Sequence, residues 1–273
     1  MSSIFLLLLI GYSTYLFLQV KATMKAIHSP ITIENPPTEL PLPTTPPQIS
    51  SEPKNNTPSP VTLLLLGIDQ VQNSPGRADT ILVLTVNPTS QTIKMLSIPR
   101  DTYTEIVGLN FYDKINHSYA FGGVAMTYTT VETLLQIPID YVVSINMEGF
   151  IDLIDTLNGV TIDNPFAFST DEYDFPKGTL VLSGHQTLAY VRMRYDDPLG
   201  DFGRQNRQRM VVENLLKQLS SLHMIWQVPS VLETIRSNVE TNITYENMKT
   251  FIKSYKPALN NIEQLTLKWV KDG

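Results

Sequence analysis

The chain has 273 residues, of which 42% are hydrophobic and 17% are charged, and its net charge is -6 at pH 7. This length suffices to bury the core of one large domain or two small ones, and the acidic balance argues against general nucleic-acid binding, which relies on a broad basic surface. The absence of cysteine excludes thiol catalysis and cysteine-based metal sites.

The chain opens with an uncharged apolar run, Ile4–Val20 (IFLLLLIGYSTYLFLQV). At about 1.5 Å per residue, this run is at the short end for a membrane-spanning helix. A cleaved signal peptide is the alternative, but no small-x-small cleavage site follows, so we predict a retained transmembrane anchor over residues 4–20. The positive charges nearest to this run, Lys21 and Lys25, follow it, and by the positive-inside rule they would place the C-terminal part in the cytoplasm. An outward-facing domain requires a basic cytoplasmic tail before the run, and we expect such a tail upstream.

Proline dominates the next segment, because ten of the nineteen prolines lie between Pro30 and Pro60. No periodic apolar pattern survives there. We therefore predict an extended, semi-rigid spacer over residues 21–60 and a folded domain over residues 61–273. An anchor followed by a spacer indicates a domain that is held at some distance from a membrane.

The folded domain alternates strand patterns with helix patterns. Short apolar runs predict strands at 61–69, 80–88, 92–99, 139–146, 160–164 and 265–270. Amphipathic patterns predict helices at 125–136, 147–159, 183–191 and 201–222, and residues from about 224 onward also read as helical. This alternation predicts an α/β fold, and the turn NPTSQ at 87–91 predicts a hairpin and hence a mixed sheet.

Charged residues stand where these predicted strands end. Asp69 ends the first strand, Arg77 and Asp79 lie in GRADT after a glycine-bearing loop, and Arg100 and Asp101 lie in IPRD after the third. Strand ends are where ligands bind in open α/β sheets. Arg77 and Asp79 are two residues apart, so in an extended chain they project to one face. Local salt bridges are the alternative, and surface pairs of that kind contribute little.

Arginine is also concentrated in YVRMRYDDPLGDFGRQNRQR, residues 190–209, which hold five of the eight arginines. Arg192 and Arg194 are again two residues apart. We expect Asp201 to be the N-cap of a helix that continues to about residue 220. On that helix, Arg204 and Gln208 share a face that becomes apolar further along.

Arginines near a helix start oppose the helix dipole, so they cost stability unless an anion is bound there. A solvated basic face is the alternative, and it suits Arg207 and Arg209 better than Arg204. The residues therefore predict a phosphate or pyrophosphate site. The groups expected to hold the anion are Arg77, Arg100, Arg192, Arg194 and Arg204.

Asp69 and Asp79 flank the loop beside this site. Two carboxylates suit Mg²⁺, which takes few protein ligands and shares the phosphates of its substrate, so we predict Mg²⁺ as cofactor. No Walker loop is present. The polar loop KINHSYAFGG, residues 114–123, is a further candidate for contact with the site. Ser183 and Gln186 form a predicted capping box, which assigns His185 between them to a helix start.

These motifs together resemble the LytR–CpsA–Psr family. The matching stretches span most of residues 61–222, and they agree in order and local context. They are GID at 67–69, GRADT at 76–80, IPRDT at 98–102, KINHSYAFGG at 114–123, YVRMR at 190–194 and DFGRQNRQR at 201–209.

The resemblance implies a three-layer α/β/α sandwich with a central mixed sheet and a hydrophobic tunnel that holds a lipid tail. It implies a membrane-anchored, extracellular phosphotransferase of Gram-positive cells. Such enzymes move a glycopolymer, for example teichoic acid or capsular polysaccharide, from a polyprenyl-pyrophosphate carrier to a peptidoglycan sugar hydroxyl. By position, Asp69 and Asp79 match the family's Mg²⁺ ligands. The positions that match its pyrophosphate contacts are Arg77, Arg100, Arg192, Arg194, Arg204 and Gln208.

We expect the arginines and Mg²⁺ to neutralise the pyrophosphate while the sugar hydroxyl attacks, since phosphoryl transfer needs mainly positioning and electrostatics. Arg100 and Asp101 are the predicted catalytic residues, with Asp101 as candidate general base. Three alternatives stay open: a polyprenyl-pyrophosphate phosphatase that uses water as acceptor, a non-catalytic polyprenyl-phosphate binding module, and a transcriptional regulator. The acidic chain and the predicted outward-facing anchor speak against the last.

Overall fold

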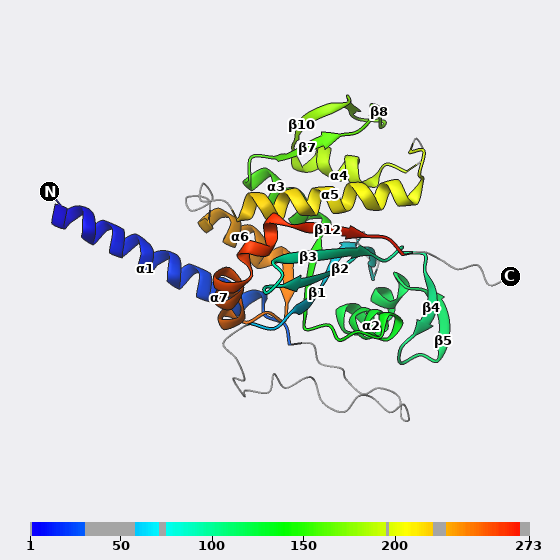
Figure 1. Ribbon diagram of the computed structural model, residues 1–273, viewed down its shortest axis with the longest axis horizontal. Helices are drawn as coiled ribbons and strands as arrows, with labels where there is room; N and C mark the ends of the chain where they lie inside the picture. Colours follow the sequence, from blue (N-terminus) through cyan, green and yellow to red (C-terminus); the bar gives the residue numbers. More distant parts are fainter. Residues whose placement is uncertain (1, 31–57, 71–74, 195–196, 221–227, 268–273) are drawn as a thin grey trace. The chain divides into compact units, whose positions relative to one another are not determined.

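The computed structural model describes residues 2–30, 58–70, 75–194, 197–220 and 228–267, with only the backbone of residues 2–10. The chain divides into two compact units, whose helices and strands are labelled in Figure 1. The first unit combines Met1–Ser29 with Ile145–Phe251, and the second combines Pro30–Ser144 with Ile252–Gly273. Each unit is therefore built from segments that are distant in the sequence.

A mixed β-sheet forms the centre of the second unit. Its strands, in the order β6-β1-β2-β3-β12, are Tyr141–Asn146, Val61–Asp69, Arg77–Asn87, Thr92–Ser97 and Ile262–Leu265. β2 is antiparallel to both β1 and β3, whereas β12 is parallel to β3. The predicted mixed α/β sheet is therefore confirmed.

The hairpin between β2 and β3 follows from its turn residues. The Asn87 side-chain oxygen accepts hydrogen bonds from the backbone N–H groups of Thr89 and Ser90, at 2.9 and 3.1 Å. This is an Asx turn, which asparagine forms readily. Gln91 completes the turn with a φ of 54°. The local interaction fixes the β2–β3 register and so the position of the residues that follow β3.

The remaining elements of the second unit cover and extend this sheet. They are β4 (Tyr103–Ile106), β5 (Phe111–Lys114), α2 (His117–Leu135) and the 3-10 helix η2 (Lys256–Asn260). The core between them is made of aliphatic side chains, among them Leu64, Leu66 and Ile81, which are at most 2% exposed. α2 starts earlier than the predicted helix and is kinked at Gly122 and Gly123, whose backbone angles are not helical.

The first unit packs helices against small antiparallel sheets. Its elements are α1 (Ser2–Ile27), α3 (Met147–Thr156), β7 (Val160–Asn164), β8 (Phe168–Ser169), β9 (Asp174–Phe175), β10 (Gly178–Leu182), α4 (Gly184–Arg192), α5 (Asp201–Leu219), α6 (Val228–Asn238), β11 (Val239–Thr241) and α7 (Tyr245–Ser254). The unit ends within α7, at Phe251. The predicted capping box at the start of α4 is confirmed, because the side chains of Ser183 and Gln186 each bond the other's backbone N–H. The core includes Phe175 and Tyr190, both almost fully buried.

The N-terminal segment differs from its predicted boundaries. α1 continues to Ile27, so residues 21–27 are helical and do not belong to an extended spacer. The sequence KATMKAI consists largely of strong helix formers and precedes the first proline of the segment, Pro30. Met24 and Ile27 are buried, and α1 packs on α6 within the first unit.

Several predicted segments lie partly outside the described residues. They are the central part of the spacer, residues 31–57, the end of the predicted last strand, the end of the helix at 201–222 and the start of the helical region from about residue 224. The last strand itself begins earlier than predicted, since β12 covers Ile262–Leu265. Among the residues whose side chains the structure describes, no helix is both long and apolar enough to span a membrane.

Candidate functional site

The paired ends of β1 and β2 carry three of the predicted site residues. Asp69 lies opposite Arg77 in the antiparallel register, and Asp79 is two residues further along β2. Directly opposed residues share a face, so Asp69 and Arg77 project from the same side of the sheet, whereas Asp79 has no register partner on β1. The register shifts between Gly67 and Ile68. Such a bulge re-aims side chains next to the irregularity and is common beside active sites.

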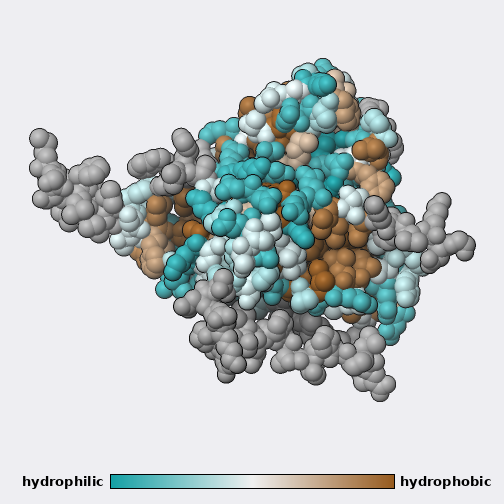
Figure 2. All heavy atoms as spheres, in the orientation of Figure 1, coloured by the Kyte–Doolittle hydropathy of each residue, from teal (hydrophilic) through white to brown (hydrophobic). Residues whose placement is uncertain are grey.

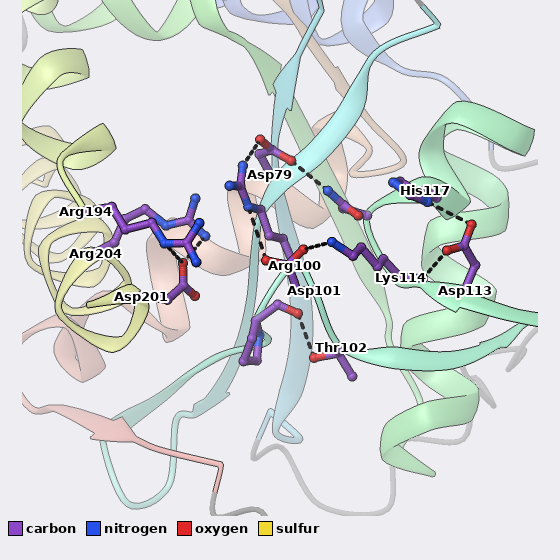
Figure 3. Close-up of polar contacts among 12 residues, drawn as sticks. Asp79, Arg100, Asp101, Thr102, Asp113, Lys114, His117, Arg194, Asp201 and Arg204 are labelled. Carbon is purple, nitrogen blue, oxygen red and sulfur yellow. Dashed lines mark hydrogen bonds and ion pairs between the residues drawn. The ribbon is translucent and has the colours of Figure 1, made fainter. Parts of the chain in front are cut away.

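Asp79 is the centre of a tight polar cluster in the second unit (Figure 3). One of its carboxylate oxygens accepts a hydrogen bond from the Arg100 guanidinium. The other accepts a bond from the side-chain amide of Asn116 at 2.9 Å. The side chains of Asp79 and Arg100 are only 19% and 26% exposed, so the solvent screens this pair less than it would a surface pair.

Backbone hydrogen bonds hold Arg100 and Asn116 next to each other. Thr102 closes a turn by donating from its N–H and hydroxyl to the Pro99 carbonyl, at 2.9 and 2.6 Å. The Asn116 N–H donates to the Arg100 carbonyl at 3.2 Å. The segment before α2 is therefore tied to the turn after β3, which confirms that the KINHSYAFGG loop reaches the Asp79 cluster.

Asn116 itself has an unusual environment. Its side chain is 4% exposed, and no described residue donates a hydrogen bond to its Oδ1 atom. The amide must present its NH₂ group to the Asp79 carboxylate, which can only accept. The Oδ1 atom is then fixed as a buried acceptor, and a buried polar group without a partner costs free energy. A bound donor would relieve that cost.

Two further pairs surround the cluster. The Lys114 ammonium lies 2.7 Å from one Asp101 oxygen, and the Arg100 Nε lies 3.8 Å from the other. His117 Nδ1 lies 2.8 Å from an Asp113 oxygen. The hydrogen bond from His117 holds the pKa of Asp113 below its usual range. Asp101 is 41% exposed, so a ligand can reach its carboxylate.

In the first unit, the Asp201 carboxylate lies close to two of the predicted arginines, Arg194 and Arg204 (Figure 3). Its Oδ1 atom lies 2.7 Å from Arg204 Nη2 and 4.0 Å from Arg194 Nε. Its Oδ2 atom accepts a hydrogen bond from Gln205 at 2.8 Å. One carboxylate thus faces two guanidinium groups, which leaves net positive charge at the start of α5. Such an arrangement can bind an anion through pre-oriented donors.

The predicted capping role of Asp201 is wrong. The N-cap position of α5 is Gly200, with a φ of 55°, and Asp201 is the first helical residue. The side chain of Asp201 points to arginines and not to the free N–H groups of the first turn. Its negative charge still complements the positive end of the helix dipole.

The interpretation of Arg207 and Arg209 as a solvated basic face is also wrong, because they are only 3% and 4% exposed. Arg207 pairs with the buried carboxylate of Asp197 and donates to the backbone carbonyls of Tyr190, at 3.0 Å, and Met193. Its guanidinium also lies 5.4 Å from the centroid of the Phe168 ring. Burial lowers the pKa of the Arg209 guanidinium.

The other predicted residues of this segment are more exposed. Arg192 is the last residue of α4 and contacts the sulfur of Met147, so it is helical and not extended as predicted. Arg192 and Arg194 are exposed, and Met193 between them is buried. Gln208 is half-buried, one turn after Arg204 on α5.

The two carboxylates fit a magnesium site of the kind that relies on its substrate. No group of three or more His, Cys, Asp or Glu side chains converges in the described ranges. Mg²⁺ needs only one or two protein carboxylates when substrate phosphates and water complete its shell. Asp69 and Asp79 lie at the paired ends of neighbouring strands, and the buried Asn116 Oδ1 atom lies beside Asp79. The donor set therefore fits Mg²⁺.

The sequence profile of the LytR_cpsA_psr family matches residues 14–272. The chain belongs to this family. It is 43% identical over 258 residues to the polyisoprenyl-teichoic acid–peptidoglycan teichoic acid transferase TagU of Bacillus subtilis, a match that covers 94% of this chain and 80% of that protein. The Bacillus licheniformis protein of the same name is 48% identical over 77% of this chain and 68% of its own length.

Solved structures of the family agree with the fold. The crystal structure of B. subtilis TagU is 44% identical, with a TM-score of 0.62 over 77% of this chain and 85% of that one. TagT bound to LIIa-WTA is 32% identical, with a TM-score of 0.64 over 78% and 80%. A protein described as a transcriptional regulator from Enterococcus faecalis has a TM-score of 0.69 at 39% identity, over 78% and 79%.

Replacing Asn116 with alanine should lower kcat/KM for transfer by roughly 10- to 100-fold, because a lost hydrogen bond to a charged group costs about 1.5–3 kcal/mol. The Asp79 carboxylate would then lose one of its two donors. The measurement is kcat/KM for transfer, with the exposed Asn260→Ala as the matched control. Equal activity of the two variants would mean that Asn116 has no part in positioning Asp79.

Proposed function

We propose that this protein is a phosphotransferase that moves a glycopolymer from a polyprenyl-pyrophosphate carrier to a sugar hydroxyl of peptidoglycan, forming a phosphodiester. The observation that carries the proposal is the Asp79–Arg100–Asn116 cluster, formed by the motifs GRADT, IPRDT and KINHSYAFGG in a chain that belongs to the LytR_cpsA_psr family. The teichoic acid transferase activity named for TagU supports the glycopolymer as substrate.

In this proposal, the chain's residues orient and neutralise a pyrophosphate. Arg100 offers guanidinium donors that Asp79 and Asp101 hold in place, and Arg77 lies two residues before Asp79 on β2. Guanidinium groups bind phosphate oxygens with two parallel hydrogen bonds. We assign phosphate contacts in the first unit to Arg192, Arg194, Arg204 and Gln208, on the basis of the family resemblance and the net positive charge beside Asp201.

The proposed reaction forms one bond and breaks one. The oxygen of the sugar hydroxyl attacks the phosphorus that carries the glycopolymer, and the bridging P–O bond to the lipid phosphate breaks. The lipid monophosphate leaves with the electron pair of that bond. Asp101 accepts the hydroxyl proton, since its carboxylate is partly exposed beside Arg100. Arginines aimed at the charge that develops in the transition state lower the barrier.

We propose that Asp69 and Asp79 hold Mg²⁺. When bound, the ion would neutralise negative charge on the leaving phosphate. The carboxylates of the chain would position it on the sheet face that carries Arg77. Asn116, through its NH₂ group, would keep the Asp79 carboxylate oriented toward that face.

The polyprenyl tail requires an apolar surface, and we propose that the second unit supplies it within a three-layer α/β/α fold. Figure 2 shows an apolar area beside α2. Hydrophobic side chains that are only partly buried pack against the core of this unit, among them Tyr119, Val124 and Leu267. Burying a lipid chain there would be favourable at about 0.8 kcal/mol per CH₂ group. These residues are our candidates for the lining of a lipid tunnel.

We further propose that the protein is attached to the cell membrane by a single pass over residues 4–20, with its catalytic part outside the cell. The support is the uncharged run IFLLLLIGYSTYLFLQV and the location of the proposed acceptor. A carrier lipid in the membrane and an acceptor in the wall are both accessible to an enzyme that is anchored in this way.

The experiment that tests the function is turnover by the purified full-length chain. A synthetic polyprenyl-pyrophosphate glycolipid is supplied with and without a peptidoglycan glycan oligomer, and products are separated by chromatography. Glycan-dependent formation of a conjugate supports the transferase. Carrier cleavage at the same rate without acceptor would identify a phosphatase, and binding without turnover would identify a non-catalytic module.

Removing divalent metal should abolish transfer. We expect EDTA to lower the rate at least roughly 100-fold, because the leaving phosphate then departs without a neutralising cation, and added Mg²⁺ should restore it. Asp79→Asn should weaken Mn²⁺ binding measured by electron paramagnetic resonance, whereas the exposed Asp171→Asn should not. Full activity in EDTA would rule out the metal at Asp69 and Asp79.

A further inference from the structure

The β4–β5 hairpin in the second unit exposes two tyrosines that its own packing does not use. Tyr103 is 71% exposed and Tyr112 is 58% exposed. Their ring centroids lie 5.9 Å apart, with the rings tilted by 34°. In the antiparallel register, Lys114 lies opposite Tyr103 and Glu105 lies opposite Tyr112. These four side chains therefore share one face, which we call the hairpin face.

The opposite face of the hairpin anchors it to the unit. Thr104 and Ile106 are 9% and 0% exposed. The Phe111 ring packs edge-on against Phe121 of α2, with centroids 5.5 Å apart. The hairpin is thus held in place without the two tyrosines, so their exposure calls for another explanation. Exposed apolar groups gathered on one surface indicate a binding site.

We propose that the hairpin face binds the glycan strand of the acceptor, with the rings of Tyr103 and Tyr112 stacked on sugar rings. This inference rests on the proposed function, because it names the surface that receives the peptidoglycan. A pyranose ring has a face rich in C–H bonds that packs on the negative face of an aromatic ring. The tyrosine hydroxyls, Glu105 and Lys114 offer donors and acceptors for sugar hydroxyl and amide groups.

The position of the hairpin face supports this occupant. Lys114 belongs to the face, and its ammonium lies 2.7 Å from Asp101, the proposed base. Tyr103 follows Asp101 by two residues, across the turn that Thr102 closes on Pro99. A glycan that lies along the hairpin face therefore brings a sugar hydroxyl to Asp101. The binding surface and the proposed reaction centre are continuous within one unit.

The charges on the hairpin argue for a glycan and against a lipid bilayer. Segments that bind membrane surfaces combine apolar residues with several lysines or arginines, which anionic lipids attract. The hairpin face has one lysine and one glutamate, Glu105, and the opposite face carries Asp113. Anionic lipids would be attracted weakly at most. The binding of an uncharged sugar ring does not depend on such electrostatic attraction.

The test compares full-length chains with Tyr103→Ala and Tyr112→Ala together, Tyr103→Phe and Tyr112→Phe together, and the control Val181→Ala. Val181 lies on β10 and is 67% exposed. The probe is an un-cross-linked oligomer of alternating N-acetylglucosamine and N-acetylmuramic acid, and calorimetry measures its binding. We expect at least roughly tenfold weaker binding for the double alanine variant, by analogy with stacking of other rings on aromatic side chains. The double phenylalanine variant should retain most of the affinity.

Several results would overturn the inference. One is unchanged oligomer binding by the double alanine variant. Another is that the double alanine variant loses binding to phosphatidylglycerol vesicles but keeps its binding to the oligomer. Equal loss in the Val181→Ala control would also overturn it. Thermal unfolding checks that each variant is folded. Binding is measured without turnover, so the two proposals can fail separately. If the chain binds the oligomer through the tyrosines but catalyses no transfer, the proposed function alone is refuted. Normal transfer with unchanged acceptor KM in the double alanine variant would refute the hairpin face alone.

Discussion

Replacing Arg100 with alanine should lower kcat/KM for glycopolymer transfer by roughly 10²–10³-fold, the loss typical for one donor to a developing oxyanion. The guanidinium bridges Asp79 and Asp101, so its removal takes away a phosphate contact and leaves two carboxylates without their shared cation. Those carboxylates would then repel the pyrophosphate. Steady-state kinetics with a synthetic carrier lipid measures the effect.

Arg100→Lys separates charge from geometry. A lysine keeps the positive charge but cannot form two parallel hydrogen bonds with a phosphate or hold both aspartates at once. We expect this variant to regain only a minor part of the lost activity. Arg236→Ala is the matched control, since Arg236 is an exposed arginine on α6. Transfer within twofold of wild type in Arg100→Ala would remove Arg100 from the proposed site.

Replacing Arg207 with leucine should destabilise the first unit by about 3–5 kcal/mol, the cost of leaving one partner of a buried ion pair alone. Asp197 would keep a buried charge, because its side chain is only 3% exposed. The carbonyls of Tyr190 and Met193 would lose their donors as well. Space is tight here: a methyl group on Gly203 would lie 1.9 Å from the Asp197 carboxylate.

Urea unfolding followed by circular dichroism tests this prediction, with the exposed Arg236→Leu as control. The double variant Arg207→Leu with Asp197→Leu should be more stable than Arg207→Leu alone, because it removes the isolated charge. Transfer activity should fall together with stability, since Arg207 and Asp197 hold the segment that joins α4 to α5, which carries Arg194. A loss below 1 kcal/mol for Arg207→Leu would show that the pair is not essential to the fold.

The sequence was sufficient to predict the second-unit cluster because local rules govern it. Asp79 and Arg100 follow from the position of charged residues at strand ends, and the Asx turn at Asn87 fixes the register between the strands. Asn116 carried a weaker signal, since only its place in a polar loop pointed to it. Its bond to Asp79 depends on a tertiary contact across 37 positions, which no periodicity in the sequence reveals.

The roles within the arginine-rich segment could not be assigned in the same way. Arg204 and Arg207 lie on one helix and are both buried, at 6% and 3% exposed, and nothing in their spacing distinguishes their roles. The difference lies in their partners. Arg207 finds the buried Asp197 and two backbone carbonyls at the end of α4, whereas Arg204 meets Asp201. Composition predicted an anion site in this segment but not which arginines support the fold.

The bond formed in the product is the most direct test of the central claim. The full-length chain, a ³¹P-observable glycolipid donor and a glycan oligomer would be incubated with Mg²⁺, and the purified glycan examined by ³¹P nuclear magnetic resonance. A new phosphodiester resonance on the glycan, absent without acceptor and absent for Arg100→Ala, is the predicted result. Release of glycopolymer phosphate as a monoester, with a glycan that carries no phosphorus, would contradict the account.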